Sequence, residues 1–245
     1  MNVYVTDGSE NCFYTAVFSA CTDKSCLLLS RSFQLPLGAQ IVCVQEEKEK
    51  SDRVKRRLLQ YDRHSLDDIG LILRSCSPER EMVALRYIRR IVQERAPVRD
   101  RRADASVSAA WDLRGKVTLE AHRMKGFLRF MEGANGVWYA PFTPDNDILD
   151  LILPHFLRRL GGQPFVMHDL SRRKAALWNG KDCVIVQTEE KVDVPLSPDE
   201  ENFQNLWKQY YESVNIAQRP HEKQMKGYMP VRYWKFLPEK NGRPF

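Results

Sequence analysis

Hydrophobic and polar positions in the first quarter of the chain alternate between strand-like and helix-like spacing. Residues 1–7 alternate and predict a strand that ends at Asp7-Gly8-Ser9. Residues 10–21 and 46–61 predict helices, and residues 26–45 predict irregular structure or short strands, with the strand pattern clearest at 41–44. The side chains expected to face the core in these two helices are Phe13, Val17, Phe18, Ala20, Val54, Leu58 and Leu59.

Helical spacing continues through residues 63–125. Ser65-Leu-Asp-Asp68 predicts the start of one helix through a capping-box-like pattern, and Pro78 predicts the first turn of the next. A third helix is predicted from about Ser106 to Lys125, with Gly126 just past its C-terminus. Residues 63–125 are therefore expected to be entirely helical.

From Phe127 the period of the pattern changes to two. Residues 127–131 and 137–142 predict a hairpin, which is followed by a helix over 143–160 that Pro154 should kink or split. Three more strands are predicted, and Asn179-Gly180 is a strong hairpin signal between the last two. Their ranges are 165–169, 174–178 and 182–187.

These elements predict an α+β fold. Its sheet should be mostly antiparallel or mixed and backed by helices, with a helical insertion between the N-terminal and the central strands. We expect four segments in one compact unit: an α/β segment at 1–62, a helical segment at 63–125, a β-β-α-β-β-β core at 126–187, and a C-terminal part at 188–245.

The C-terminal part begins with a polar linker and then a helix over residues 199–216. Prolines, rings and cations in residues 219–245 predict extended structure that wraps over the body. We expect Trp234 and Leu237 to pack onto the body, and Arg232 and Lys235 to stay available to a ligand. The residues expected along one side of the helix are Phe203, Leu206, Trp207, Tyr210 and Val214.

Composition excludes several classes of protein. A hydrophobic content of 43% in 245 residues is enough for a folded core. No apolar run approaches the ~20 residues of a membrane span, and the N-terminus lacks the features of a signal peptide, so we expect a cytoplasmic protein with no membrane partner. The six cysteines form no Cys-x-x-Cys pair, which predicts structural buried thiols and no metal or cofactor.

The net charge of +6 is unevenly distributed. Residues 86–102 hold seven arginines against two acids, and residues 204–245 hold eight Lys or Arg against three Glu. Such clusters are typical of proteins that bind nucleic acid or another polyanion. A solvated helix face with internal ion pairs would produce the same pattern, and charge alone leaves both interpretations open.

No phosphate-binding loop, dinucleotide fingerprint, nucleophile elbow or zinc pattern occurs in the sequence. The polar residues that remain as candidates for chemistry are His122, His155, His168 and Asp169. His168 and Asp169 are adjacent on a predicted strand and point to opposite faces, so they do not readily serve one site. An acid–base or metal centre of His122, His155 and Asp169 is one interpretation, and structural hydrogen bonding is the other.

Cations and aromatic rings occur together in the central segment and again near the C-terminus. If the sheet forms as predicted, the cations converge on one edge and neutralise phosphates, while the rings stack on unpaired bases. The alternative is that the rings fill the core. The predicted nucleic-acid-binding cations are Arg123, Lys125, Arg129, Arg172, Arg173, Lys174, Arg232 and Lys235, and the predicted stacking rings are Trp138, Tyr139 and Trp178.

Several of these residues lie in ordered blocks. The blocks are Glu120-x-His-Arg-Met-x-Gly-Phe-x-Arg-Phe130, Trp138-Tyr-Ala-Pro141, Pro154-His-Phe156 and Met229-Pro-x-Arg-Tyr-Trp-Lys235. In this combination the chain resembles a bacterial family of DNA-metabolism or DNA-repair proteins. The resemblance extends from Tyr4 to Glu239.

The resemblance implies a pathway more than a reaction. Members of that family are typically encoded beside a radical-SAM protein that acts on DNA, and a similar module is fused to a uracil-DNA glycosylase domain. The resemblance therefore implies a radical-SAM partner whose cluster ligands belong to the partner.

Three hypotheses follow. The first is a DNA-binding accessory protein in repair or base modification, which binds single-stranded or damaged DNA and acts with a partner enzyme. The second is a nucleic-acid hydrolase or lyase that uses His122, His155 and Asp169. The third is a scaffold that binds only proteins, which dispersed basic residues would favour.

Overall fold

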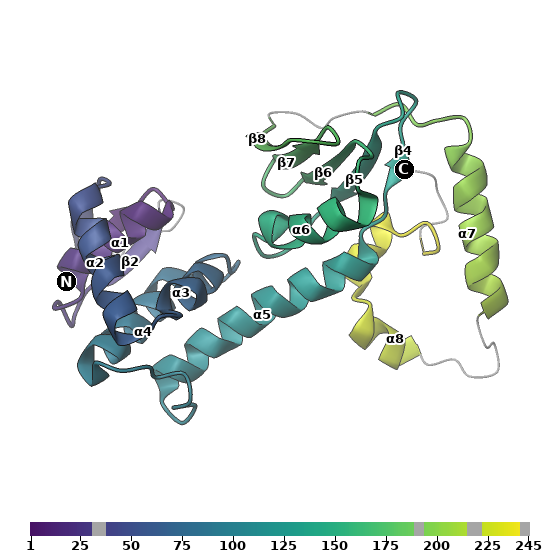
Figure 1. Ribbon diagram of the computed structural model, residues 1–245. Helices are drawn as coiled ribbons and strands as arrows, with labels where there is room; N and C mark the ends of the chain where they lie inside the picture. Colours follow the sequence, from purple (N-terminus) through teal and green to yellow (C-terminus); the bar gives the residue numbers. More distant parts are fainter. Residues whose placement is uncertain (31–37, 189–193, 215–221, 241–245) are drawn as a thin grey trace. The chain divides into compact units, whose positions relative to one another are not determined.

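The computed structural model describes residues 1–30, 38–188, 194–214 and 222–240 of the chain (Figure 1). The chain divides into an N-terminal unit, Met1–Leu119, and a C-terminal unit, Glu120–Phe245. Helix α5 (Ala105–Phe127) contains the boundary between them. The mixed helix and sheet content confirms the predicted fold class, and helices α2 to α5 occupy the predicted helical insertion between strands β3 and β4.

The N-terminal unit contains a parallel sheet of three strands in the order β2-β1-β3. These are β1 (Asn2–Thr6), β2 (Leu27–Ser30) and β3 (Gln40–Cys43), and the two outer strands both pair with β1. The helices of this unit are α1 (Glu10–Ala20), α2 (Lys48–Tyr61), α3 (Ser65–Leu73) and α4 (Arg80–Glu94), together with the first part of α5. The predicted helices are therefore confirmed to within about two residues, the uncertainty of any helix boundary.

A buried ion cluster holds the helices of this unit together. Asp68, 1% exposed, accepts from Arg99 (Nη2–Oδ2 2.7 Å) and from Arg114 (Nε–Oδ1 2.9 Å). The guanidinium groups of both arginines also lie near the ring of Trp111, at 5.8 and 4.4 Å from its centroid. Arg99, one of the arginines of residues 86–102, therefore forms an ion pair within the fold.

Three details of the N-terminal prediction are wrong. Val17 and Leu58 are buried as predicted, whereas Phe18 and Leu59, also expected in the core, are exposed. Cys43 and Cys76 are exposed thiols, whereas Cys12 and Cys26 are buried as expected.

No helix of the described residues is long and apolar enough to cross a membrane.

The C-terminal unit is built on a five-stranded sheet in the order β4-β5-β6-β7-β8. Its strands are β4 (Met131–Glu132), β5 (Trp138–Phe142), β6 (Phe165–Asp169), β7 (Lys174–Trp178) and β8 (Cys183–Gln187). All neighbours are antiparallel except β5 and β6, which are parallel and joined through α6 (Leu149–Leu160). This is the predicted β-β-α-β-β-β order.

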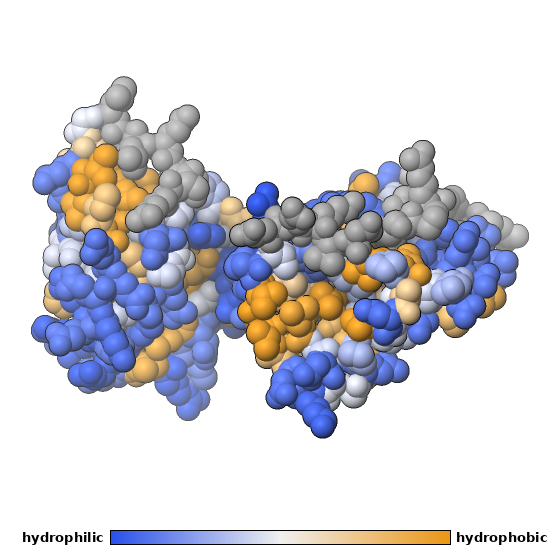
Figure 2. Space-filling model, turned by 90° about the horizontal axis from the view of Figure 1, so that it is seen from above, coloured by the Kyte–Doolittle hydropathy of each residue, from blue (hydrophilic) through white to orange (hydrophobic). Residues whose placement is uncertain are grey.

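Helix α6 packs on one face of this sheet through aromatic contacts. The ring of Phe130 lies between those of Phe156 on α6 and Phe165 on β6, at 5.2 and 5.6 Å between centroids. Pro154 lies within the helix without ending it. On the other face of the sheet, Leu177 and Val184 are paired across β7 and β8 and exposed, and Figure 2 shows an apolar patch on this side of the unit.

Two boundaries in this unit differ from the prediction. Helix α5 runs through Gly126 to Phe127, so the first hairpin strand shortens to β4. Helix α6 begins at Leu149 and not at residue 143, because residues 143–148 form a loop whose backbone is bound by other segments. The late start of α6 involves contacts between residues that are 25 and 26 positions apart in the sequence.

Helix α7 (Glu200–Val214) confirms the helix predicted over residues 199–216. The following segment was predicted to be extended and is helical instead: it contains α8 (Glu222–Tyr228) and the 3-10 helix η1 (Val231–Phe236). Pro230 is the N-cap of η1, a position where proline is tolerated, so it begins a short helix. Leu237 is fully buried as predicted, Trp234 is half-buried, and the buried Tyr233 was not foreseen.

Helix α7 turns its apolar side outward. Phe203, Leu206 and Tyr210 are each 57–60% exposed, while Glu200 and Gln204 are buried. Glu200 accepts from the backbone N–H of Glu132 (2.9 Å) and from Gln204 (2.9 Å), so polar contacts attach this helix to the sheet.

Removal of residues 229–245 should lower the free energy of unfolding by several kcal/mol, because buried Tyr233 and Leu237 are lost. A matched pair separates burial from chain length: Leu237→Ala should cost about 2–5 kcal/mol, and Val231→Ala, at a 53% exposed side chain of η1, less than about 0.5 kcal/mol. Chemical denaturation measures all three. Equal midpoints for the truncated and full chains would show that this segment does not stabilise the fold.

Candidate nucleic-acid interface

A buried carboxylate, that of Glu120, organises the candidate interface. Glu120 lies on α5 and is 3% exposed. Its oxygens accept from the backbone N–H groups of Asp145 (3.0 Å) and Asn146 (2.8 Å), from Asn146 Nδ2 (2.6 Å) and from the Tyr233 hydroxyl (2.6 Å). Burial and this carboxylate raise the pKa of Tyr233, so its hydroxyl stays protonated and donates a hydrogen bond to Glu120. Glu120 thus connects α5, the loop 143–148 and η1.

Two arginines predicted to bind nucleic acid hold the same loop. Arg172 donates to the carbonyl oxygens of Pro144 (3.1 Å) and Asp145. Arg232 Nη2 lies 3.1 Å from Asp145 Oδ2 and 3.7 Å from Glu120 Oε1, and it donates to the Tyr233 hydroxyl oxygen (2.8 Å). The structure therefore brings Arg172 and Arg232 together at Asp145, where both have protein partners.

Asp169 closes the turn after β6. Its side chain is fully buried, accepts from the backbone N–H groups of Ser171 (3.0 Å) and Arg172 (3.2 Å), and pairs with the Arg172 guanidinium (3.1 Å). Burial raises the pKa of Asp169, and the Arg172 charge opposes that shift. His155 lies on α6 beside Phe156, and His122 is exposed on α5; among the described residues, neither forms a hydrogen bond or ion pair with Asp169.

His168 belongs to a buried hydrogen-bonded chain. Its Nδ1 lies 2.9 Å from the Tyr139 hydroxyl and its Nε2 lies 3.0 Å from Thr188 Oγ1. Burial lowers the pKa of His168, which favours the neutral ring, with one nitrogen donating and the other accepting. Tyr139 is only 6% exposed, so its ring offers no open face for a base.

A groove lies where the end of α5, β5, the end of α6 and α7 meet. We call it the Trp138 groove. It contains two adjoining cavities of ≈ 420 and ≈ 290 Å³ that share four lining residues, Arg129, Phe130, Trp138 and Trp207. Arg159 and Gln163 are among the other residues that line the larger cavity, and Phe203 is among those that line the smaller one. The groove thus combines four aromatic rings with two guanidinium groups.

Arg129 is held in the groove by contacts on several sides. It donates to the carbonyl oxygen of Gly126 (2.7 Å) and to Glu239 Oε1 (2.7 Å), and its guanidinium carbon lies 5.4 Å from the Trp207 ring centroid. The other oxygen of Glu239 accepts from Trp207 Nε1 (2.9 Å). A carboxylate from the C-terminal segment therefore binds a cation and a ring of the groove.

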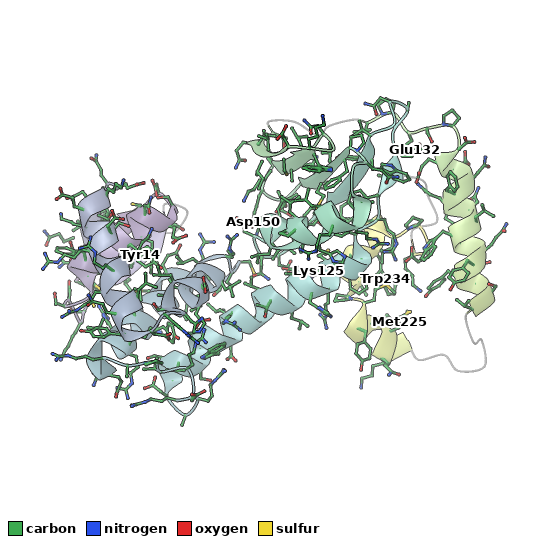
Figure 3. The ribbon with its side chains drawn as sticks, in the orientation of Figure 1. Tyr14, Lys125, Glu132, Asp150, Met225 and Trp234 are labelled. Atoms are coloured by element: carbon green, nitrogen blue, oxygen red, sulfur yellow. The ribbon has the colours of Figure 1, made fainter. Side chains whose placement is uncertain are left out.

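A basic cluster adjoins the Trp138 groove. Burial and, to a lesser extent, the positive charges of Lys125, Arg159 and Arg158 lower the pKa of His155. Arg158 and Arg159 follow His155 by three and four residues on α6, so the three side chains share one side of that helix. Lys125 lies on the part of α5 that runs below α6 in Figure 3. Arg158 and Arg159 are exposed in the last turn of α6. Positive charge therefore extends beyond the groove.

The other predicted residues lie outside this groove. Arg123 donates to the carbonyl oxygen of Gly227 on α8 (3.1 Å), and Lys174 lies 3.3 Å from Asp147. Arg173 is exposed at a turn with a positive φ of 52°, and the Lys235 ammonium lies 4.6 Å from the Phe236 ring centroid. Trp178 donates to the Gly161 carbonyl oxygen (2.8 Å). The predicted cations thus form separate groups.

Sequence reasoning missed Arg158, Arg159 and the contribution of Trp207 to the groove. Two adjacent arginines in the last turn of a predicted helix could have indicated a cationic site. The helix dipole also favours cations at that position, so the pattern alone does not identify a site. The pairing of Arg129 with Glu239 had no local signal, because the two residues are 110 positions apart.

A protein-family model described as "Domain of unknown function (DUF4130)" matches residues 78–239. The chain belongs to the DUF4130 family. The matched residues include every residue that lines the Trp138 groove and the whole Glu120 network. No curated protein and no solved structure matches this DUF4130 protein.

Metal ligands do not gather in this DUF4130 protein: among the residues with described positions, no group of three or more His, Cys, Asp or Glu side chains is placed to hold an ion. The interface presents cations and aromatic rings. Guanidinium groups contact phosphate oxygens, and indole rings stack on bases.

The Glu120 network predicts a graded loss of stability. Tyr233→Phe removes one donor and should lower the free energy of unfolding by about 1–3 kcal/mol. Glu120→Ala leaves the remaining buried polar partners unpaired and should cost about 3–5 kcal/mol. Tyr228→Phe, at a 70% exposed ring, is the matched control and should stay within about 0.5 kcal/mol. Urea denaturation measures the series, and a Tyr233→Phe protein as stable as the parent would contradict this role for Glu120.

Proposed function

We propose that this protein is a DNA-binding accessory protein of DNA repair or base modification, which holds single-stranded or damaged DNA in the Trp138 groove for a partner enzyme. The observation that carries the proposal is that one groove contains both guanidinium groups and aromatic rings. The guanidinium groups belong to Arg129 and Arg159, and the rings to Phe130, Trp138 and Trp207. Cations with sequence-tolerant aromatic platforms are the combination that single-strand-binding proteins use.

The electrostatic part of the binding would come from the groove and the basic cluster beside it. Arg158 and Arg159 lie three and four residues after His155 on α6, and Arg159 also lines the groove. Among the described contacts, Arg158 and Arg159 have no carboxylate partner, so their charge is available to phosphates. Each cation that neutralises a phosphate releases counterions and adds to the salt dependence of binding.

The stacking part favours unpaired bases over duplex DNA. Trp207 is 40% exposed, and Trp138 is half-buried in the wall of both cavities. A base can reach such rings only when it leaves the helical stack, as it does in a single strand or at a lesion. The expected preference is therefore for single-stranded over duplex DNA of the same length.

The resemblance to DNA-metabolism proteins supports a place in repair or base modification. By the same resemblance, we propose a radical-SAM protein as the physical partner, acting with this chain in the cytoplasm on DNA. The hydrolase or lyase alternative gains no support from geometry, because Asp169 is engaged by Arg172 while His155 lies in the basic cluster.

Fluorescence anisotropy with a labelled dT oligonucleotide tests the proposal. Trp207→Ala should weaken binding by about 1–3 kcal/mol without changing the salt slope, because a stacking contact is lost. Arg159→Ala should weaken binding and reduce the slope of log K against log salt by about 0.7, because one phosphate contact is lost.

The matched controls for these variants are Tyr228→Ala, an exposed ring outside the groove, and Lys181→Ala, an exposed cation on the β7–β8 turn. Both should bind the oligonucleotide about as the parent does. The proposal fails if the parent does not bind at ~50 mM salt, where the phosphate contribution is strongest, or if the controls lose as much affinity as the groove variants.

Glu239 should oppose DNA binding, because its carboxylate occupies Arg129 and Trp207. Glu239→Gln retains the size of the side chain and removes the charge, so affinity for the dT oligonucleotide should rise by about 1 kcal/mol, roughly five-fold. Glu201→Gln, exposed on α7, makes the same change in net charge and should have a smaller effect. A fall in affinity for Glu239→Gln would show that the carboxylate positions Arg129 for the ligand.

A further inference from the structure

A second groove lies within the N-terminal unit, between helices α1, α2 and α4. It has a volume of ≈ 410 Å³, within the range of sites that accept a ligand or several side chains. Its helices α1 and α2 precede residue 78, where the match to the DUF4130 model begins. Nothing in the Trp138 groove depends on it.

The floor of this groove is aliphatic. Val17 from α1, Val54 and Leu58 from α2, and Ile88 and Val92 from α4 line it. Phe18, 39% exposed, is the only aromatic residue in the lining, and it already has Arg53 at 5.5 Å and Lys50 at 5.9 Å from its ring centroid. Such a floor suits leucine-like side chains better than the flat face of a base.

The rim of the groove is cationic. Arg53, Arg56 and Arg57 line the groove and are exposed. Carboxylates pair with the neighbouring lysines of α2, Lys50 with Glu47 and Lys55 with Glu10. No ion pair to the three arginines occurs among the residues whose positions are described. Arg57 bonds only weakly to the neutral Gln60 (3.4 Å).

We propose that the α1–α2–α4 groove binds an acidic amphipathic helix of a partner protein. The apolar face of such a helix would insert two or three side chains between α1, α2 and α4, as helix-in-groove complexes do. Its carboxylates would then face Arg53, Arg56 and Arg57. A guanidinium group forms bidentate hydrogen bonds with a carboxylate. Charge complementarity selects an acidic partner, and the aliphatic floor selects a helix over a nucleic acid.

The test uses the full chain and a fluorescein-labelled synthetic helix of about 18 residues, with leucine at i, i+3, i+4 and i+7 and glutamate on the opposite side. A scrambled peptide of the same composition is the peptide control. Arg53→Glu with Arg56→Glu should weaken binding of the amphipathic peptide at least about ten-fold, a loss of about 1.4 kcal/mol. Lys24→Glu with Lys116→Glu, an equal charge change at exposed positions of the same unit, should change it less than about two-fold.

Three results would overturn the proposal. The amphipathic peptide fails to bind, the scrambled peptide binds equally well, or both pairs of substitutions weaken binding to the same degree. A dT oligonucleotide that loses affinity with Arg53→Glu and Arg56→Glu, while the peptide does not bind, would assign the groove to nucleic acid instead. These outcomes are separate from the Trp207 and Arg159 series, since those residues lie in the C-terminal unit.

Discussion

The buried carboxylate of Glu120 joins three segments that are far apart in the sequence. A carboxylate removed from water is costly unless its oxygens are fully hydrogen-bonded, and here Asp145, Asn146 and Tyr233 supply the donors. Because the acceptor is charged, these hydrogen bonds are stronger than neutral ones. The shape of the loop before α6 and the position of η1 both follow from this interaction.

The Trp138 groove depends on the same arrangement. Glu239 lies three residues after the end of η1, and Tyr233 fixes η1 against α5, so the Glu239 carboxylate can reach Arg129 and Trp207. The structure thus uses carboxylates in two ways: Glu120 stabilises a framework, and Glu239 neutralises a cation in a groove. Both carboxylate side chains are 3% exposed, so they differ in their partners: backbone amides and a tyrosine hydroxyl for Glu120, and a guanidinium and an indole for Glu239.

Local pattern predicted most elements, and the failures occur where distant residues decide the structure. The Asn179-Gly180 hairpin and the β-β-α-β-β-β order followed from turn chemistry and period. The late start of α6 depends on Glu120, which binds the backbone of the preceding loop. The outward apolar side of α7 depends on Glu200, which binds the β4 backbone. The sequence identified the cationic residues, but which of them lie together could be learned only from the three-dimensional structure.

The most direct test of the account is the pKa of His155, followed by NMR with and without a bound dT oligonucleotide. In the free protein burial and the nearby cations keep this pKa below its ordinary value. Phosphates bound to Lys125, Arg158 and Arg159 would screen those charges and favour the protonated ring, so the account predicts that the pKa rises when the oligonucleotide binds. An unchanged His155 pKa at saturating oligonucleotide would place the DNA elsewhere and contradict the proposed interface.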